Sequence, residues 1–267
     1  MRFAAGSLPG VPRRRDVLPV RRPLRRLTQL TMLFATADER SGAPIACTTS
    51  RTAAGATMPT AIADSDVLLV VDVQNDFCPG GKLAVPHGDE VVAPINRLAG
   101  RFRHVVLTQD WHPAGHQSFA SSHPGKRPFE TVIVDYGQQI LWPDHCVQGT
   151  VGAQFHDGLQ IPHAELVLRK GFRPTIDSYS ALYENDRETP TGLAGYLRER
   201  GLRRIFIAGL AFDFCVRYSA EDARREDFAV TVIEDACRAI DVGGSLAATR
   251  ATFARLDIAT LAADAIA

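Results

Sequence analysis

One seven-residue run, VLLVVDV at residues 67–73, constrains the fold of this chain most strongly. The run is apolar and largely β-branched, with no polar residue before Asp72. Such a run is typical of a strand buried on both faces of its sheet, as in parallel sheets that are covered by helices. Further strands are predicted at residues 104–110, 165–170, 203–210, 229–235 and 258–261.

Segments with helical spacing separate most of these strands, at residues 89–102, 191–201, 214–227 and 243–256. Strands that alternate with helices form βαβ units, so the sequence predicts an α/β domain with a doubly wound parallel sheet flanked by helices. The stretch 111–164 fits no such unit. Long irregular stretches inside a compact domain are usually functional, which makes this one a place to look for a site.

The first 60 residues differ in composition from the rest of the chain. They carry ten Arg and three acidic residues, about +7, against about −7 for the remainder. Their Pro, Gly and Arg content and lack of periodicity favour a disordered extension over residues 1–60. A start codon placed too early, before Met58, and a targeting peptide are the alternatives. We expect one folded domain at residues 61–267.

Charge and cysteine content limit the classes of binding partner and the redox state of the compartment that we expect. A mildly acidic body gives no electrostatic reason to bind nucleic acid, and no apolar run approaches the roughly 20 residues that span a bilayer. The five cysteines are widely scattered and include no C-x-x-C pair. We therefore expect a reducing, cytoplasmic compartment and no disulfide framework. The sequence leaves the oligomeric state open, a homo-oligomer included.

Chemically useful side chains stand at the carboxyl ends of four predicted strands, where α/β sheets place their sites. They are Asp72, Asp110 with His112, Lys170 and Cys215. This concentration is the main indication of an enzyme that the residues themselves provide.

Cys215 has two interpretations. It follows a strand and stands in the first turn of a predicted helix, with Asp213 as the expected N-cap. The helix dipole there would lower the pKa of a thiol and its amides would hold an oxyanion, as a nucleophile needs. Alternatively, Cys215 is a small buried apolar residue. Lys170 would pair with a thiolate and Asp72 would carry its proton.

The segment QDWHPAGHQSF at 109–119 suggests a metal site. Asp110 and His112 are two residues apart, so in an extended chain both point to one side. His145, in LWPDHC at 141–146, would complete a set of ligands for a divalent cation, with His116 as a fourth ligand. A surface pair of polar residues is the other interpretation of Asp110 and His112.

A third segment, DVQNDFCPGGKLAV at 72–85, follows the first strand. PGG indicates a turn, and Phe77 is placed to wall a pocket for a flat substrate. Cys78 has no helix terminus beside it, so we expect it to be structural.

Five stretches in this order resemble the nicotinamidase/pyrazinamidase branch of the isochorismatase-like cysteine hydrolases. They are VVDVQNDFCPGGKLAV, QDWHPAGHQSFA, WPDHCVQGT, KGFRPTIDSYSA and GLAFDFCV. The resemblance runs from about Asp66 to the C-terminus. It implies a six-stranded parallel sheet and hydrolysis of nicotinamide, and of pyrazinamide, through a cysteine thioester in NAD salvage.

The resemblance also implies roles for individual residues. The catalytic triad would be Asp72, Lys170 and Cys215, and the amides of Ala211 and Cys215 would form the oxyanion hole after a cis peptide bond before Ala211. One divalent metal ion, Zn²⁺ in the first place and otherwise Fe²⁺ or Mn²⁺, would be held by three ligands. These metal ligands would be Asp110, His112 and His145, and the ring-binding residues would be Phe77 and Trp142.

The chain departs from the family pattern at two positions. Some members have a further histidine eight residues after the metal-binding Asp, whereas His116 lies six after Asp110, which puts its ligation in question. The residue before the nucleophile is often His or Tyr and here is Phe214. We further expect the groups that activate the thiol to be separate from the metal ligands.

Three alternatives to a nicotinamidase remain. A related hydrolase acting on isochorismate or another small amide would usually lack the metal ligands. A dinucleotide-binding module would need a G-x-G-x-x-G turn after a strand, which the sequence does not have. A catalytically silent metal-binding protein would not need the triad.

Overall fold

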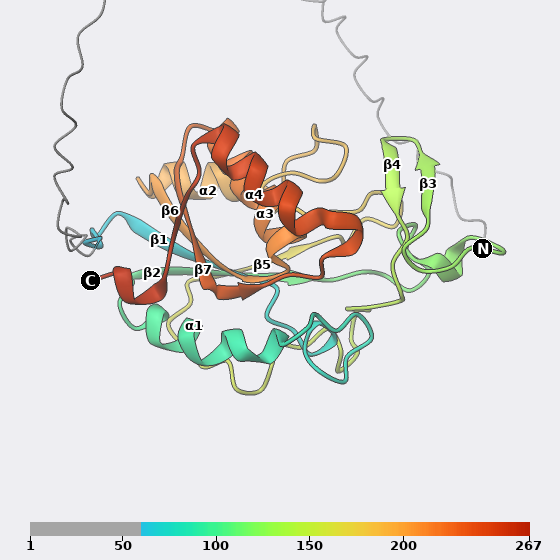
Figure 1. The fold of residues 1–267 in the computed structure, drawn as a ribbon, viewed down its shortest axis with the longest axis horizontal. Helices are drawn as coiled ribbons and strands as arrows, with labels where there is room; N and C mark the ends of the chain where they lie inside the picture. Colours follow the sequence, from blue (N-terminus) through green and yellow to red (C-terminus); the bar gives the residue numbers. More distant parts are fainter. Residues whose placement is uncertain (1–59) are drawn as a thin grey trace, which may run out of the picture. The chain divides into compact units, whose positions relative to one another are not determined.

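The computed structural model describes residues 60–267, so the predictions for residues 1–59 lie outside the described residues. Six strands form one sheet in the order β5-β2-β1-β6-β7-β8, and every neighbouring pair is parallel. These strands are β1 (Asp66–Val71), β2 (His104–Asp110), β5 (Leu166–Lys170), β6 (Arg204–Leu210), β7 (Ala229–Arg238) and β8 (Ala259–Leu261). The predicted doubly wound, six-stranded parallel sheet is confirmed (Figure 1).

Helices cover both faces of this sheet (Figure 1). They are α1 (Val92–Ala99), α2 (Leu193–Glu199), α3 (Arg217–Arg225) and α4 (Ser245–Leu256). Leu68 and Val70 of β1 pack in the cluster that contains α1, and Val67 and Leu69 pack in the cluster of the other three helices. Burying each such side chain stabilises the fold by about 1.5–3 kcal/mol. The unbroken apolar run therefore reflects a central strand with two covered faces.

The irregular stretch contains a hairpin that the sequence analysis did not predict. Strands β3 (Thr131–Val134) and β4 (Gly137–Ile140) pair antiparallel and lie beside the main sheet as a separate two-stranded unit (Figure 1). The strands have four residues each. β3 has the β-branched sequence TVIV, which was available as a signal, whereas β4 contains two glutamines and shows no apolar run. Gly137 has φ +115°, a conformation that favours glycine, directly after the turn.

The helix after β6 begins differently from the prediction. Phe212–Val216 forms a π-helical turn that leads into α3, and Ala211 occupies the N-cap position. The expected N-cap role of Asp213 is wrong. Its buried carboxylate instead accepts hydrogen bonds from the amides of Ile240 and Asp241, at 3.0 and 2.7 Å, and from the Ser245 hydroxyl. Asp213 thereby ties the loop after β7 to the turn that carries Cys215.

The two ends of the described segment lie side by side. The Thr60 amide donates to the carbonyl of Ala265 at 2.7 Å, and the Ala267 amide donates to the carbonyl of Thr60 at 3.0 Å. Within residues 60–267, no helix combines the length and apolar character that crossing a membrane requires.

Candidate active site

Three of the predicted residues meet at the carboxyl edge of the sheet. Asp72 directly follows β1, Lys170 ends β5, and Cys215 lies in the π-helical turn after β6. The Nζ atom of Lys170 is 2.7 Å from Asp72 Oδ2 and 3.5 Å from Cys215 Sγ. Because β5, β2, β1 and β6 are consecutive in the sheet, the parallel arrangement itself brings these side chains together.

Lys170 is fully buried yet remains charged. Burial alone would lower the pKa of its ammonium group, but Asp110, Asp72 and Cys215 act in the opposite direction and hold that pKa well above its usual value. The ammonium also donates to the carbonyl of Ser178 at 2.9 Å. A buried cation with this many partners is a fixed positive charge beside the thiol.

Asp72 is the carboxylate with the higher proton affinity. Burial raises its pKa, and this effect outweighs the opposing influence of Lys170. Its Oδ1 accepts a hydrogen bond from the Thr108 hydroxyl at 2.6 Å. Thr108 was not among the predicted residues, although a lone hydroxyl in an apolar strand next to a strand-end carboxylate was available as a signal.

The environment of Cys215 favours the protonated thiol. Burial raises its pKa well above the usual value, Lys170 works against this, and Asp72 and Asp110 add to it. The prediction that the helix terminus would lower this pKa is therefore wrong. Sγ lies within 4.8 Å of a carboxylate oxygen of Asp72 and of one of Asp110, so a proton acceptor is at hand.

The backbone beside Cys215 offers two amide groups. A cis peptide bond joins Leu210 and Ala211, as the resemblance implies. The amides of Phe214 and Val216 both donate to the carbonyl of Ala211, each at 3.1 Å, which fixes the turn that carries Cys215. The oxyanion-hole role of the amides of Ala211 and Cys215 stays a prediction.

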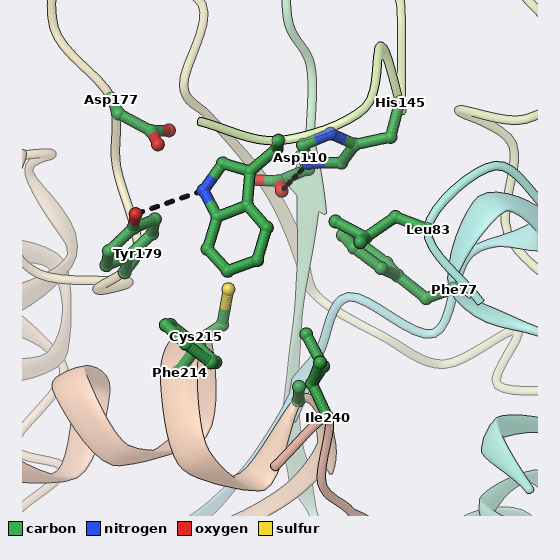
Figure 2. Close-up of a pocket in the computed structure, with 11 residues that line it drawn as sticks. Phe77, Leu83, Asp110, His145, Asp177, Tyr179, Phe214, Cys215 and Ile240 are labelled. Atoms are coloured by element: carbon green, nitrogen blue, oxygen red, sulfur yellow. Dashed lines mark hydrogen bonds and ion pairs between the residues drawn. The ribbon is translucent and has the colours of Figure 1, made fainter. Parts of the chain in front are cut away.

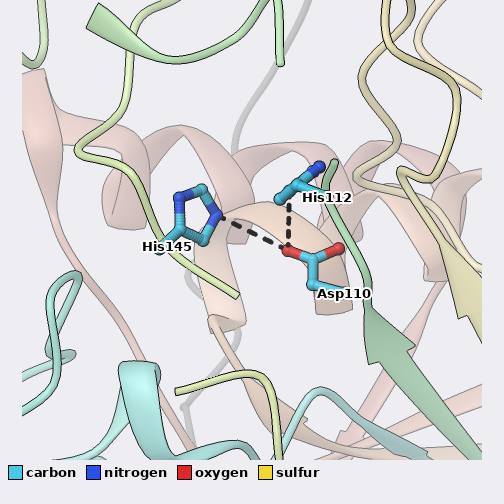
Figure 3. A group of neighbouring side chains, drawn as sticks. All are labelled: Asp110, His112 and His145. Atoms are coloured by element: carbon cyan, nitrogen blue, oxygen red, sulfur yellow. Dashed lines mark ion pairs between the residues drawn. The ribbon is translucent and has the colours of Figure 1, made fainter. Parts of the chain in front are cut away.

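Asp110, His112 and His145 form the group drawn in Figure 3. The Nε2 atoms of His112 and His145 lie 3.5 and 3.6 Å from Asp110 Oδ2. The Nδ1 atoms donate to the carbonyls of Gly171 and Pro143, each at 2.8 Å. Because the protons are held on Nδ1, both Nε2 lone pairs are free, which is the tautomer that metal ligands need. These three residues fit a divalent cation.

Gly171 is required where it stands. It has φ +64°, and a Cβ atom there would come within 2.5 Å of the His112 ring. The glycine that follows Lys170 therefore allows the strand end and the imidazole to approach each other.

His116 is placed differently from the other two histidines. Its Nδ1 is 2.7 Å from the Ser118 hydroxyl, and its Nε2 is 2.8 Å from the carbonyl of Arg173. It also forms a second group with His112 and Asp177, with ligand atoms within 4.8 Å of one another. Since both ring nitrogens have protein partners, His116 fits a structural role better than a place among the ligands.

Asp110 belongs to both parts of the site. Its Oδ1 is 2.5 Å from Lys170 Nζ, while its Oδ2 faces the two histidines. Burial raises the pKa of Asp110, but Lys170 and the histidines outweigh it and hold that pKa well below the usual value. The expectation that the thiol-activating groups are separate from the metal ligands is wrong, because Lys170 contacts Asp110 directly.

A pocket opens onto these groups (Figure 2). It is lined by Phe77, Leu83, Asp110, Trp142, His145, Asp177, Tyr179, Ala211, Phe214, Cys215 and Ile240. Phe77 and Trp142 thus line it as predicted. Asp177 and Tyr179 were missed, although their D-x-Y spacing would put both on one side of an extended segment. Aromatic walls and few polar groups suit a small flat ligand.

Comparisons with known proteins agree with this geometry. Residues 66–264 match the family model for the isochorismatase domain. A nicotinamidase of Acinetobacter baylyi is 55% identical over 184 residues, which cover 69% of this chain and 86% of the relative.

Two solved structures extend the likeness. The Acinetobacter baumanii nicotinamidase/pyrazinamidase is 52% identical with a TM-score of 0.75, covering 76% of this chain and 98% of that one. The Pyrococcus horikoshii pyrazinamidase in complex with zinc is 32% identical with a TM-score of 0.61, covering 74% and 99%. This chain belongs to the isochorismatase family, in its nicotinamidase/pyrazinamidase branch.

Proposed function

We propose that this protein hydrolyses nicotinamide to nicotinate and ammonia, and that it acts on pyrazinamide in the same way. One observation carries the proposal: the buried ammonium group of Lys170 contacts Asp72, Cys215 and Asp110. Cys215 and Asp110 line a pocket with aromatic walls. The similarity to nicotinamidases and pyrazinamidases supports the choice of substrate.

The first half of the reaction forms a thioester. Asp72 accepts the proton of Cys215 as Sγ attacks the carboxamide carbon, and Lys170 stabilises the negative charge on sulfur. The amides of Ala211 and Cys215 donate to the oxygen that becomes negative. Asp72 then gives the proton to the departing nitrogen. The C–N bond breaks, ammonia leaves, and the acyl group stays on Sγ.

The second half regenerates the thiol. Asp72, again a carboxylate, accepts a proton from a water molecule as its oxygen attacks the thioester carbon. The C–S bond breaks and nicotinate is released, while the proton on Asp72 returns to Sγ. Burial raises the pKa of Asp72, which favours a carboxyl group that can take up and return a proton in each half of the reaction.

Asp110, His112 and His145 would hold one divalent metal ion. Two imidazoles and one carboxylate suit Zn²⁺ in the first place, and Fe²⁺ or Mn²⁺ otherwise. Zinc is present in the related Pyrococcus horikoshii pyrazinamidase. When bound, such an ion would act as a Lewis acid that orients the substrate by its pyridine nitrogen. Phe77 and Trp142 would hold the ring between them.

Three further assignments are part of the proposal. Residues 61–267 are the hydrolase domain, since they contain every site residue. The four described cysteines are free thiols, which fits a reducing, cytoplasmic compartment. A neutral small amide is the ligand that an aromatic pocket with a thiol floor accommodates best.

Release of ammonia from nicotinamide by the purified protein tests the activity directly. We expect turnover with nicotinamide and pyrazinamide, and none with isochorismate. The set of three metal ligands favours a pyridine carboxamide over the substrates of metal-free relatives. Turnover of isochorismate without turnover of nicotinamide would assign the chain to the other branch, and no turnover of any of them would favour a silent metal-binding protein.

A further inference from the structure

One buried amide joins the β3–β4 hairpin to the pocket wall. Gln139 of β4 is 1% exposed. Its Nε2 lies 2.9 Å from Asp177 Oδ2 and 3.1 Å from the Tyr179 hydroxyl oxygen. Asp177 and Tyr179 line the pocket, but Gln139 does not. The hairpin thus reaches the ligand space only through other side chains.

The chemistry of its neighbours fixes the orientation of this amide. A carboxylate only accepts hydrogen bonds, so the nitrogen of Gln139 must face Asp177. The oxygen then faces the other way and accepts from the Tyr136 hydroxyl at 2.8 Å. With both ends of the amide bound in a buried place, Gln139 has one arrangement, and losing it would remove the hydrogen bond to Asp177 Oδ2, while Oδ1 keeps the Ser178 amide at 2.8 Å.

Tyr179 extends the chain of contacts to Trp142. Its hydroxyl oxygen also accepts from Trp142 Nε1 at 3.0 Å. Figure 2 marks this bond with a dashed line that ends at the Tyr179 hydroxyl. The Gln139 nitrogen has two protons and also lies 2.6 Å from the carbonyl of Ile140, so Tyr179 shares these protons with the other two acceptors. Among residues 60–267 no acceptor is found for the proton of the Tyr179 hydroxyl, which is thus available to a ligand in the pocket.

We propose that Gln139 is a positioning residue for the substrate, which acts through Asp177 and Tyr179. It holds the pocket wall, including the indole of Trp142, in the arrangement that receives a flat ring, and it directs the Tyr179 proton toward the ligand. The proposal rests on the proposed function. A wall that is ordered before binding lowers the entropic cost of binding. Because Gln139 touches neither Sγ nor the triad, its effect falls on substrate binding and not on the chemical step.

Gln138 provides a matched control for the test. It is the preceding residue of β4 and has the same side chain, but it is exposed. We expect Gln139→Leu to raise the KM for nicotinamide roughly tenfold with kcat changed less than about twofold. Gln138→Leu should leave both constants unchanged. Gln139→Glu keeps the size but sets a carboxylate against Asp177, so it should raise KM further.

A double-mutant cycle tests the route through Tyr179. If Gln139 acts through this residue, adding Gln139→Leu to Tyr179→Phe raises KM by less than the product of the single effects. An unchanged KM in both Gln139 variants, a loss confined to kcat, or a lower unfolding temperature with normal KM would overturn the proposal.

Nicotinate affinity separates this inference from the proposed function. Titration of the wild-type protein and the two Leu variants with nicotinate needs no turnover. If the wild-type protein releases no ammonia, weaker nicotinate binding by Gln139→Leu alone still supports the positioning role. Equal affinity in all three, or no binding by the wild-type protein, contradicts it.

Discussion

The strand ends and the long connections of this domain contribute to the same site in different ways. Asp72 and Lys170 stand at the ends of β1 and β5, where the sheet fixes their backbone. His145, Asp177 and Tyr179 stand on connections, where side-chain hydrogen bonds and aromatic contacts fix them. A rigid sheet thus places the groups for the proposed chemistry, and the connections shape what the pocket receives.

Asp110 is where these two regions meet. It ends β2, yet one of its oxygens contacts Lys170 and the other faces the histidines. A change in the metal group therefore reaches the triad through a single carboxylate. The predictions below test how far the two regions are independent.

The largest effect is expected at the strand ends. Cys215→Ala removes the proposed nucleophile and should lower ammonia release by at least about a thousandfold. Cys78→Ala and Cys237→Ala should keep most of the activity, because burial raises the pKa of these thiols to about 11 and about 12 and neither contacts Lys170. Ammonia assays and unfolding temperatures check this. Substantial turnover by the Cys215 variant would remove the thioester from the scheme.

The next effect concerns the metal ligands. We expect about one equivalent of divalent metal per chain, and His112→Ala and His145→Ala should each lower it sharply along with activity. His116→Ala should lower metal content only weakly, since both its ring nitrogens bind the protein. Elemental analysis with assays of chelated and remetallated protein measures both quantities.

The same chelated protein tests the link through Asp110. Because Asp110 also contacts Lys170, removing metal should change the alkylation rate of Cys215 and leave those of Cys78 and Cys237 unaltered. An unchanged alkylation rate at Cys215 would show that the metal group does not influence the thiol through Asp110. Full activity without metal would contradict the orienting role and reopen the choice of substrate.

A smaller effect is expected in the connection after β5. Burial raises the pKa of Glu184 to about 7 from an ordinary 4.5, with Arg173 opposing it. Its folded pKa exceeds its unfolded one, so its contribution to stability is fully present below pH 4.5 and is lost as pH rises through 7. Glu184→Gln should remove this loss. Its unfolding temperature, relative to wild type, should therefore be higher at pH 8 than at pH 5, and an equal difference at both would contradict this.

The smallest effect is expected at the N-terminus. A chain that begins at Met58 keeps Thr60, whose hydrogen bonds to Ala265 and Ala267 join the ends of the described segment. It also keeps every residue of the site. We expect unchanged kcat, KM and unfolding temperature. A loss of yield or turnover would show that residues 1–57 contribute to the domain.

The sequence predicted the sheet well and the connections poorly. All six strands of the sheet were found, because apolar runs such as that of β1 require two covered faces. The hairpin was missed, because its strands have only four residues each and β4 shows no apolar run. Gln138 and Gln139 look alike in the sequence, and only the fold buries one of them. Asp213 was assigned to the wrong task, since its partners Ile240 and Ser245 are about thirty residues away.

By itself, the sequence determined which residues are the candidates for the chemistry, since strand-end position and motif spacing are local properties of the chain. Only the tertiary structure decided how these residues influence one another. The pKa of Cys215 is raised although its local position suggested the opposite, because burial depends on the whole fold. Likewise, Lys170 joins Asp72 to Asp110 because three strands distant in sequence are neighbours in the sheet. Electrostatic effects depend on distance and burial, and neither is a property of a local segment.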